Sequence, residues 1–296
     1  MSVRLGINPI TWSNDDMPEL GGDTPLETCL AEAREAGFEG VELGNKFPRE
    51  PEALRAKLAD YDLALASGWY SAKLLERSAE EEIEAVQDHL RLLKAQGCTA
   101  MVFCEVSGCV HGDRGTPVAD RPRMSEPEWA RLTDGLNQVG AYLHSEGVRL
   151  AYHHHMGTVV ESEADIDRLM AATDASVGLL LDTGHLVYAG GDPSAVLERH
   201  GERVVHVHCK DIRAERLAAA RERNASFLDA VLDGAFTVPG DGSIDYAPLF
   251  RQLKGLGYAG WLVVEAEQDP ATAHPLTYAR KGYEYLARTS AEAGLR

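Results

Sequence analysis

The chain has 296 residues, of which 44% are hydrophobic and 26% are charged, so it can bury a full core without disulfides or a partner. Its formal net charge of -18, with no offsetting run of Lys and Arg, argues against binding to nucleic acid or to an anionic membrane surface. The sequence has no signal segment, no apolar stretch of the roughly 20 residues that span a bilayer, and five cysteines without metal-knuckle spacing, which predicts a cytoplasmic protein with reduced thiols.

Short β-rich runs alternate along the chain with longer segments whose apolar residues have helical spacing. The predicted strands cover residues 4–9, 39–44, 63–70, 100–106, 149–155, 177–183, 204–210 and 260–267. Helical segments such as 24–37, 78–97 and 126–147 lie between them, and several begin at Ser or Thr and end at Gly, as capped helices do. Residues 107–124 and 235–245 lack either period and are expected to form loops on the rim.

Apolar strands that are each followed by a helix are typical of a parallel sheet covered on both faces. Repetition of this unit over a chain of 296 residues predicts an α/β fold, a (β/α)8 TIM barrel forming one domain over residues 1–296. No glycine-rich phosphate-binding motif follows any predicted strand, so the sequence does not support a dinucleotide or P-loop site.

Ligand-type side chains gather at the carboxyl ends of the last four predicted strands, the edge at which barrel enzymes place their chemistry. These residues are His153, His154 and His155, then Asp182 and His185, then His206, His208 and Lys210, and finally Glu265 and Glu267. Because side chains alternate along a strand, His153 and His155 share a face, and His154 is expected to point away and serve structure. Burying so many ionisable groups is costly unless a divalent cation such as Mn²⁺, Co²⁺, Fe²⁺ or Zn²⁺ neutralises them.

Weaker signals follow the first three strands, where polar and aromatic side chains lie close together. The residues are Asn8 at the first strand, Glu42, Asn45 and Lys46 at the second, and Trp69 and Tyr70 at the third. Polar groups beside aromatic faces suit a polyol ring, so these residues are candidates for substrate binding. Packing against the rim is the alternative for the two aromatic residues.

Several segments resemble known families. LLLDTGH (179–185), HVHCKD (206–211) and WLVVEAEQDP (261–270) resemble the xylose isomerase-like superfamily of sugar isomerases and epimerases. More specifically, GINPITWSNDD (6–16), SGWYSAKLLERS (67–78), YHHHMGTVVE (152–161) and FTVPGDGSID (236–245) resemble the myo-inosose-2 dehydratase family of inositol catabolism. The likeness covers nearly the whole chain.

The resemblance implies a lyase that dehydrates 2-keto-myo-inositol (scyllo-inosose), a cyclic polyol ketone, to a trihydroxycyclohexane-1,2-dione. It implies Asp182, His208 and Glu265 as metal ligands, Mn²⁺ or Co²⁺ as the ion, and glutathione as an assisting thiol. Many superfamily members have a Glu at the end of the fifth strand as fourth ligand, whereas this chain has His153 there. We expect His153 to be the fourth ligand, with His155 or water as the alternatives.

The dehydration needs a base for the α-proton and an acid for the departing β-hydroxyl. We expect His155, His185 and Lys210 in these roles, with Glu267 in reserve, and the sequence leaves open which is acid and which is base. A ketose epimerase or isomerase on the same barrel is the nearest alternative, followed by a non-catalytic sugar-binding protein. Metal-dependent cleavage of DNA at abasic sites is a further alternative, but the net charge of -18 argues against it. The sequence does not determine the oligomeric state, and a homo-oligomer is possible.

Overall fold

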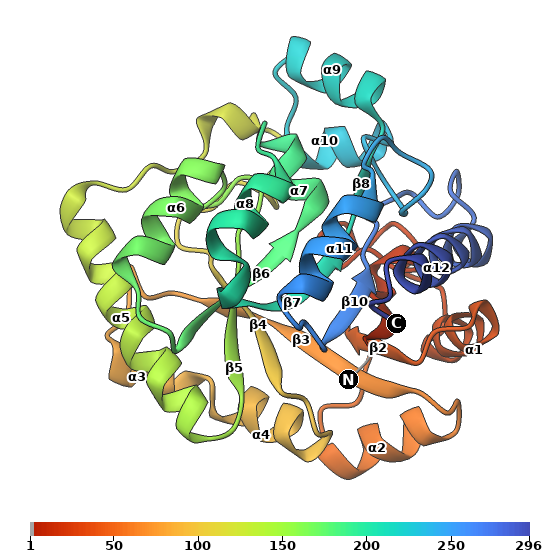
Figure 1. Ribbon diagram of the computed structural model, residues 1–296, viewed down its shortest axis with the longest axis horizontal. Coiled ribbons are helices and arrows are strands. Elements are labelled where there is room, and N and C mark those ends of the chain that lie inside the picture. The colour runs from red at the N-terminus through yellow and green to blue at the C-terminus, as the bar shows by residue number, and fades with distance from the viewer. Residues whose placement is uncertain (1–2) are drawn as a thin grey trace.

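The computed structural model describes residues 3–296 and contains a closed barrel of parallel strands surrounded by helices (Figure 1). The barrel strands are β1 (Arg4–Ile7), β2 (Gly40–Leu43), β3 (Ala64–Ala72), β4 (Ala100–Glu105), β5 (Arg149–His153), β6 (Val177–Asp182), β7 (Val204–Cys209) and β10 (Trp261–Val264). All eight predicted strands form, and pairing of β1 with β10 closes the barrel. The predicted TIM-barrel fold is confirmed.

The helices pack around the barrel in chain order (Figure 1). They are α1 (Leu26–Ala36), α2 (Pro51–Ala59), α3 (Ala79–Ala85), α4 (Gln87–Ala95), α5 (Glu126–Ser145), α6 (Glu163–Ala172), α7 (Thr183–Tyr188), α8 (Pro193–His200), α11 (Tyr246–Gly255) and α12 (Pro275–Glu292). The segment predicted as one helix over 78–97 divides into α3 and α4 at Val86. Within residues 3–296, no helix combines the length and the apolar character needed to cross a membrane.

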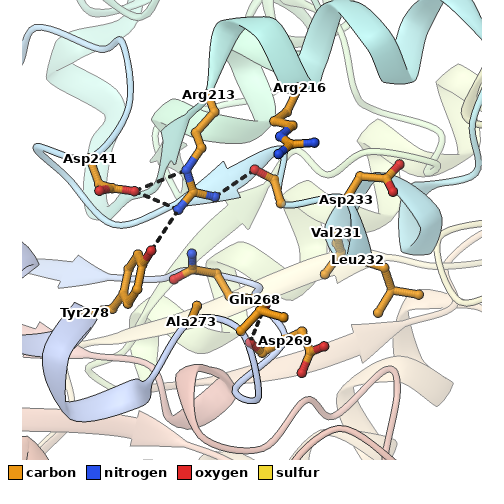
Figure 2. Close-up of a pocket in the computed structure, with 12 residues that line it drawn as sticks. Arg213, Arg216, Val231, Leu232, Asp233, Asp241, Gln268, Asp269, Ala273 and Tyr278 are labelled. Atoms are coloured by element: carbon orange, nitrogen blue, oxygen red, sulfur yellow. Dashed lines mark hydrogen bonds and ion pairs between the residues drawn. The ribbon is translucent and has the colours of Figure 1, made fainter.

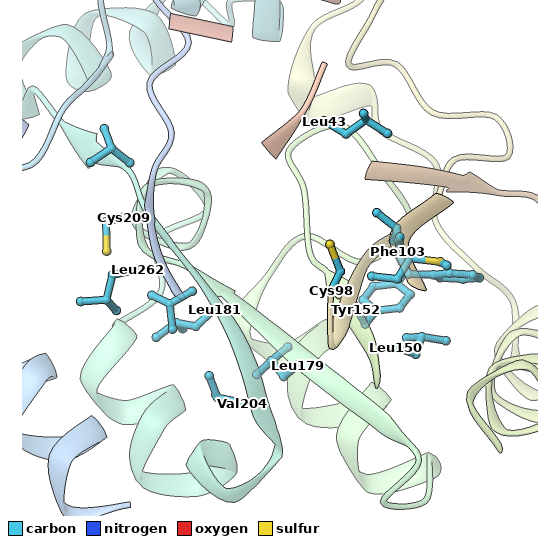
Figure 3. Packing of buried hydrophobic residues seen from close by; sticks show 14 of the residues in the cluster. Leu43, Cys98, Phe103, Leu150, Tyr152, Leu179, Leu181, Val204, Cys209 and Leu262 are labelled. Atoms are coloured by element: carbon cyan, nitrogen blue, oxygen red, sulfur yellow. The ribbon is translucent and has the colours of Figure 1, made fainter. Parts of the chain in front are cut away.

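Alternation along the strands separates an outer core from the barrel interior. Leu150 and Tyr152 of β5 belong to the core cluster that includes residues of the surrounding helices, as does Leu181 of β6 (Figure 3). Ala151 and Leu180 belong to a separate cluster. By the same alternation, the side chains two residues further along, His153 on β5 and Asp182 on β6, also face the interior and lie at the carboxyl edge of the barrel.

A change of register in β7 determines which of its side chains face inward. Leu179 of β6 pairs with Val204, but the next residue, Leu180, pairs with His206. The intervening Val205 is the extra residue of a β-bulge. Because the side-chain period of a strand is two, this extra residue sets the face on which His206 and His208 lie.

An excursion between β7 and α11 was not predicted. It contains β8 (Asp211–Ile212), α9 (Ala214–Glu222), α10 (Phe227–Leu232) and β9 (Phe236–Thr237), with β8 and β9 paired antiparallel. In Figure 1 α9 and α10 project beyond the ring of helices, and the excursion packs in a second, smaller core that also includes Met17, Val118, Met156 and Tyr188. The prediction of a loop over 235–245 is therefore wrong at Phe236 and Thr237, because a strand of this length shows no periodic pattern.

Candidate active site and metal centre

Four ligand-type side chains converge at the carboxyl ends of β5, β6, β7 and β10. They are His153, Asp182, His208 and Glu265, called here the four-ligand group, and all are buried. Each offers one ligand atom that lies within 4.8 Å of the others. The structure thus brings together the residues predicted as metal ligands, with His153 rather than His155 as the fourth member.

Three atoms of the four-ligand group are buried without a hydrogen-bond partner among residues 3–296. They are Nε2 of His153, Oδ2 of Asp182 and Nδ1 of His208, and the last of these faces Oε2 of Glu265 at 2.5 Å. The Asp182 oxygen lies 3.7 Å from the His153 nitrogen and 3.5 Å from the His208 nitrogen. Leaving a buried polar atom unpaired costs about 1–3 kcal/mol, and one cation among these atoms would satisfy them together. This nitrogen and oxygen donor set therefore fits a divalent metal ion.

Local hydrogen bonds aim these free atoms at one another. Nδ1 of His153 lies 2.7 Å from the backbone oxygen of His154, so it carries the proton and leaves the Nε2 lone pair free. The Oδ1 atom of Asp182 accepts the backbone N–H of His185 at 2.8 Å, at the start of α7. His154 stays outside the group, and its Nε2 accepts the backbone N–H of Asp182. Such outer contacts orient metal ligands in proteins.

Glu42, predicted as a substrate-binding residue, lies inside the barrel instead. Its carboxylate is 2.8 Å from Nε2 of His206 and 3.1 Å from Nε2 of His208, and it accepts a hydrogen bond from Asn8 at 2.9 Å. Burial opposes ionisation of this carboxyl, but His208 and His206 outweigh it and lower the pKa to about 2. Glu42 thereby turns Nδ1 of His208 toward the four-ligand group.

A second cluster lies beside the first. His155, His185 and Glu267 are buried and offer ligand atoms within 4.8 Å of one another; with Lys210 they form what we call the Lys210 group. The lysine Nζ lies 2.7 Å from Nε2 of His185 and 3.1 Å from Oε2 of Glu267, and also 2.7 Å from Oε1 of Glu265. Burial lowers the pKa of Lys210, but Glu265 and Glu267 outweigh it and raise the pKa, so the amine remains a cation.

A cavity of about 250 Å³ opens onto both groups. Its lining residues are Asn8, Ile10, Asp15, Asp16, Leu43, Asn45, Arg49, Trp69, Ser71, His111, His155, Glu265 and Glu267. Of the predicted catalytic residues, His155 and Glu267 line the cavity, with 3.8 Å between Nε2 and Oε1. His185 and Lys210 do not line it and lie fully buried behind.

Three predicted substrate-binding residues line the cavity: Asn8, Asn45 and Trp69. The Trp69 ring lies 5.4 Å from that of His153 and 5.6 Å from that of His155, centroid to centroid, and its Nε1 donates to Ser71. An indole face at this place can pack against the C–H face of a polyol ring.

Tyr70, also predicted to bind substrate, lies away from the cavity. Its hydroxyl donates to the buried carboxylate of Glu82 at 2.5 Å, and its ring packs against His89 and Phe103. As its neighbour on β3 is Trp69, alternation of side chains accounts for the opposite placement.

Lys46 is the third predicted substrate-binding residue that does not line the cavity. Its Nζ donates to the backbone oxygens of Gly21, Gly22 and Thr24 at 3.1, 3.0 and 2.6 Å. Lys46 therefore fastens the segment between β1 and α1, which carries the cavity residues Asp15 and Asp16.

Three further aromatic residues near the site were not predicted from the sequence. His111 lies in the irregular segment 107–124, 5.0 Å from His155 between ring centroids, and burial together with His155 lowers its pKa to about 3. In the excursion, the ring of Phe227 lies 5.1 Å from that of His155, and the ring of Phe236 lies 5.6 Å from that of His185, centroid to centroid. A histidine in a loop at the carboxyl edge was an available signal, whereas nothing in the sequence placed the two phenylalanines.

A larger hollow of about 540 Å³ lies beside the excursion, and Figure 2 shows the residues that line it. Arg213 spans one side of it and donates to Asp241 and Tyr278, while Gln268 and Asp269 border it on another. None of the four-ligand group lines this hollow, so the smaller cavity is the candidate active site.

Comparison with known families agrees with this architecture. A family model described as a xylose isomerase-like TIM barrel matches residues 30–289. The chain belongs to the xylose isomerase-like TIM barrel family. A solved structure of an L-ribulose 3-epimerase superposes on it with a TM-score of 0.69 and 17% identity, covering 99% of this chain and 96% of the epimerase. That likeness shows the fold alone.

Two sequence relatives of this family member are much more similar. The rhizopine catabolism protein MocC of Rhizobium meliloti is 52% identical over 296 residues, covering 100% of this chain and 91% of the relative. An inosose dehydratase of Geobacillus thermodenitrificans is 48% identical over 289 residues, covering 97% of each chain.

Proposed function

We propose that this protein is a metal-dependent hydro-lyase that dehydrates 2-keto-myo-inositol to a trihydroxycyclohexane-1,2-dione in inositol catabolism. The identity of 48% to an inosose dehydratase over 97% of both chains supports this substrate. The observation that carries the proposal is the pairing of two features: a buried four-ligand group with unpartnered atoms, and a cavity beside it onto which His155 and Glu267 face.

The four-ligand group is the proposed metal site, with Mn²⁺ or Co²⁺ as the ion, since its two imidazoles and two carboxylates suit both. A divalent ion bound there supplies Lewis-acid stabilisation of the negative charge that develops on the ketone oxygen. Glu42 orients the His208 ligand from behind and does not contact substrate.

The cavity walls are proposed to hold the ring of the substrate. Trp69 presents an aromatic face, while the amide side chains of Asn8 and Asn45 can exchange hydrogen bonds with ring hydroxyls. On the excursion side, Phe227 excludes water from His155, which keeps the reacting edge of the cavity dry.

His155 and Glu267 are the proposed acid–base pair. One accepts the α-proton, and the electron pair of the broken C–H bond forms the carbon–carbon double bond of an enol. The other donates a proton to the β-hydroxyl, which leaves as water when the C–O bond breaks. Proton transfer between the two side chains, 3.8 Å apart, restores the starting state, and the released enol tautomerises to the dione.

Lys210 and His185 are proposed to position this pair rather than to touch substrate, because neither lines the cavity. The Lys210 ammonium holds Oε2 of Glu267 and leaves Oε1 facing His155. The chemistry therefore divides between two residues at the cavity surface and two behind it.

The test is incubation of purified protein with 2-keto-myo-inositol, Mn²⁺ or Co²⁺ and reduced glutathione, with dione absorbance as the readout. We expect dione to form and chelation to abolish its formation. Variants of His155 and Glu267 in deuterated solvent then assign the two roles. A variant that still exchanges the α-hydrogen without eliminating water has lost the acid, and a variant that does neither has lost the base. Ketohexose turnover without dione would show an epimerase instead.

A role in rhizopine catabolism is the second candidate, favoured by the identity of 52% to MocC over the whole chain. Comparing kcat/KM for 2-keto-myo-inositol with turnover of a rhizopine distinguishes the two. A preference for the rhizopine would move the substrate assignment while leaving the metal site unchanged.

A further inference from the structure

The Lys210 group has the composition of a metal site. Nδ1 of His155 lies 2.8 Å from the backbone oxygen of Met156, which holds a proton there, and Nε2 is the ring atom that faces Glu267. With Nε2 of His185 and a carboxylate oxygen of Glu267, this makes a set of two imidazoles and one carboxylate whose ligand atoms lie within 4.8 Å of one another. Sets of this kind bind Zn²⁺, Mn²⁺, Co²⁺ and Fe²⁺.

The ammonium of Lys210 already contacts two of the three residues that would bind an ion in this group. Its Nζ lies 2.7 Å from Nε2 of His185 and 3.1 Å from Oε2 of Glu267. A metal ion would bind the same atoms at roughly 2.0–2.2 Å, so the ammonium and the ion exclude each other. Both would use the lone pairs that face the centre of the group.

Hydrogen bonds hold the backbone of Lys210, and its side-chain stem packs directly against Gly184. The hydroxyl of Tyr246 donates to the backbone oxygen of Lys210 at 3.0 Å, and the backbone N–H donates to Thr183 at 3.2 Å. A Cβ atom at Gly184 would lie 2.5 Å from Cγ of the lysine, so only glycine leaves room for the stem. The fold therefore delivers the ammonium to this point and gives the side chain little freedom to leave.

The charges of the two neighbouring groups balance with one divalent ion. Asp182, Glu265 and Glu267 are buried carboxylates, and together they carry three negative charges when ionised. A divalent ion in the four-ligand group and the Lys210 ammonium supply three positive charges. Glu42 belongs to neither group: it lies behind His208 as a further carboxylate, and it accepts hydrogen bonds from Asn8 and from the imidazoles of His206 and His208.

We infer that Lys210 is a built-in cation in the place of a second divalent metal ion. The chain then binds a single ion per protomer, in the four-ligand group, and loss of the lysine side chain opens a second site formed by His155, His185 and Glu267. The inference rests on the metal site of the proposed function but not on the reaction, so metal stoichiometry tests it whether or not the protein dehydrates an inosose.

The experiment is equilibrium dialysis of the full chain against Mn²⁺, followed by elemental analysis, for the wild type and for Lys210→Ala. We expect a single ion per chain in the wild type and a second ion in Lys210→Ala. In electron paramagnetic resonance, the second ion should convert the spectrum of an isolated Mn²⁺ into that of a coupled pair.

Matched variants separate the effect of losing the lysine charge from the effect of opening the space that its side chain fills. Lys210→Met keeps an unbranched chain in the space and should stay at a single ion, while the double variant Lys210→Ala with His185→Ala should return to a single ion. A second ion on the wild type, or a folded Lys210→Ala protein that binds no more than the wild type, overturns the inference. If Lys210→Ala does not fold, Lys210→Ser takes its place, because it also removes the charge and opens the space, and a folded Lys210→Ser protein that binds a single ion overturns the inference.

Discussion

Two neighbouring clusters of histidine and carboxylate side chains meet the same electrostatic problem in different ways. In the four-ligand group, three ligand atoms remain buried without a partner within residues 3–296. In the Lys210 group, an ammonium reaches two of the three candidate ligands. Residue types alone therefore do not identify a metal site. The Lys210 ammonium contacts both clusters, through His185 and Glu267 in one and through Glu265 in the other, but within residues 3–296 only the four-ligand group keeps buried ligand atoms without a hydrogen bond.

The largest expected effect comes from removing one charge from the four-ligand group. Asp182→Asn keeps the size of the side chain and an acceptor for the backbone N–H of His185, but it removes the anionic ligand. We expect kcat/KM to fall roughly a thousandfold, since metal stabilisation of the developing charge is worth several kcal/mol. Steady-state kinetics across a range of Mn²⁺ concentrations, with dialysis for affinity, measures it.

Asp192→Asn is the matched control for that variant. Asp192 caps α8 by accepting the backbone N–H of Ser194 at 2.8 Å, yet it lies outside both clusters. Its replacement should leave metal affinity unchanged. Wild-type metal affinity in Asp182→Asn would remove Asp182 from the ligands.

The next effect tests the Lys210 group at the cavity surface. His155→Gln removes a group that faces both the cavity and Glu267, and loss of an acid or base lowers turnover by roughly 100-fold or more. Turnover at saturating substrate and Mn²⁺ measures it, with His144→Gln on the exposed face of α5 as the control. Near-normal turnover in His155→Gln would exclude this residue from the chemistry.

A smaller effect is expected behind the four-ligand group. Glu42→Gln keeps a hydrogen-bond acceptor for His208 but removes the charge, and loss of such an outer partner lowers metal affinity by roughly 10–100-fold. The Mn²⁺ dissociation constant is the measurement. An unchanged constant combined with a raised KM for the ketone would instead support the sequence-based assignment of Glu42 to substrate binding.

The smallest effect on catalysis separates two adjacent aromatic residues. Tyr70→Phe should leave kcat/KM unchanged, because the ring lies outside the cavity, while the lost hydrogen bond to Glu82 lowers the free energy of unfolding by about 1–3 kcal/mol. Trp69→Phe should do the reverse and raise KM without a comparable loss of stability. Urea unfolding and steady-state kinetics of both variants decide it.

The fold and the four-ligand group were predictable because both follow from periodicity. Apolar runs separated by helical segments specify a barrel, and barrels place the carboxyl ends of their strands on one edge. Ligand-type residues on the inward-facing positions at the ends of β5, β6, β7 and β10 were therefore expected to lie near one another. His153, Asp182, His208 and Glu265 are brought together for that reason.

The remaining site residues depend on depth and direction, which periodicity does not supply. Glu42 lies within β2 rather than beyond its end, so it reaches His206 and His208 inside the barrel instead of the cavity. His111 and Phe227 come from segments without a repeating pattern, where only tertiary packing determines position. The sequence therefore predicted that these residues lie near the carboxyl edge of the barrel, but not which of their side chains face the cavity.

The excursion from β8 to β9 forms a wall beside His155 and His185. Its phenylalanines face His155 and His185, but they pack in a small core distinct from the main core of the barrel. Substitutions that reshape this wall need not disturb the strands that carry the ligands. Within such a scaffold, the range of accepted ring substituents can change over evolution while the reaction chemistry is inherited intact.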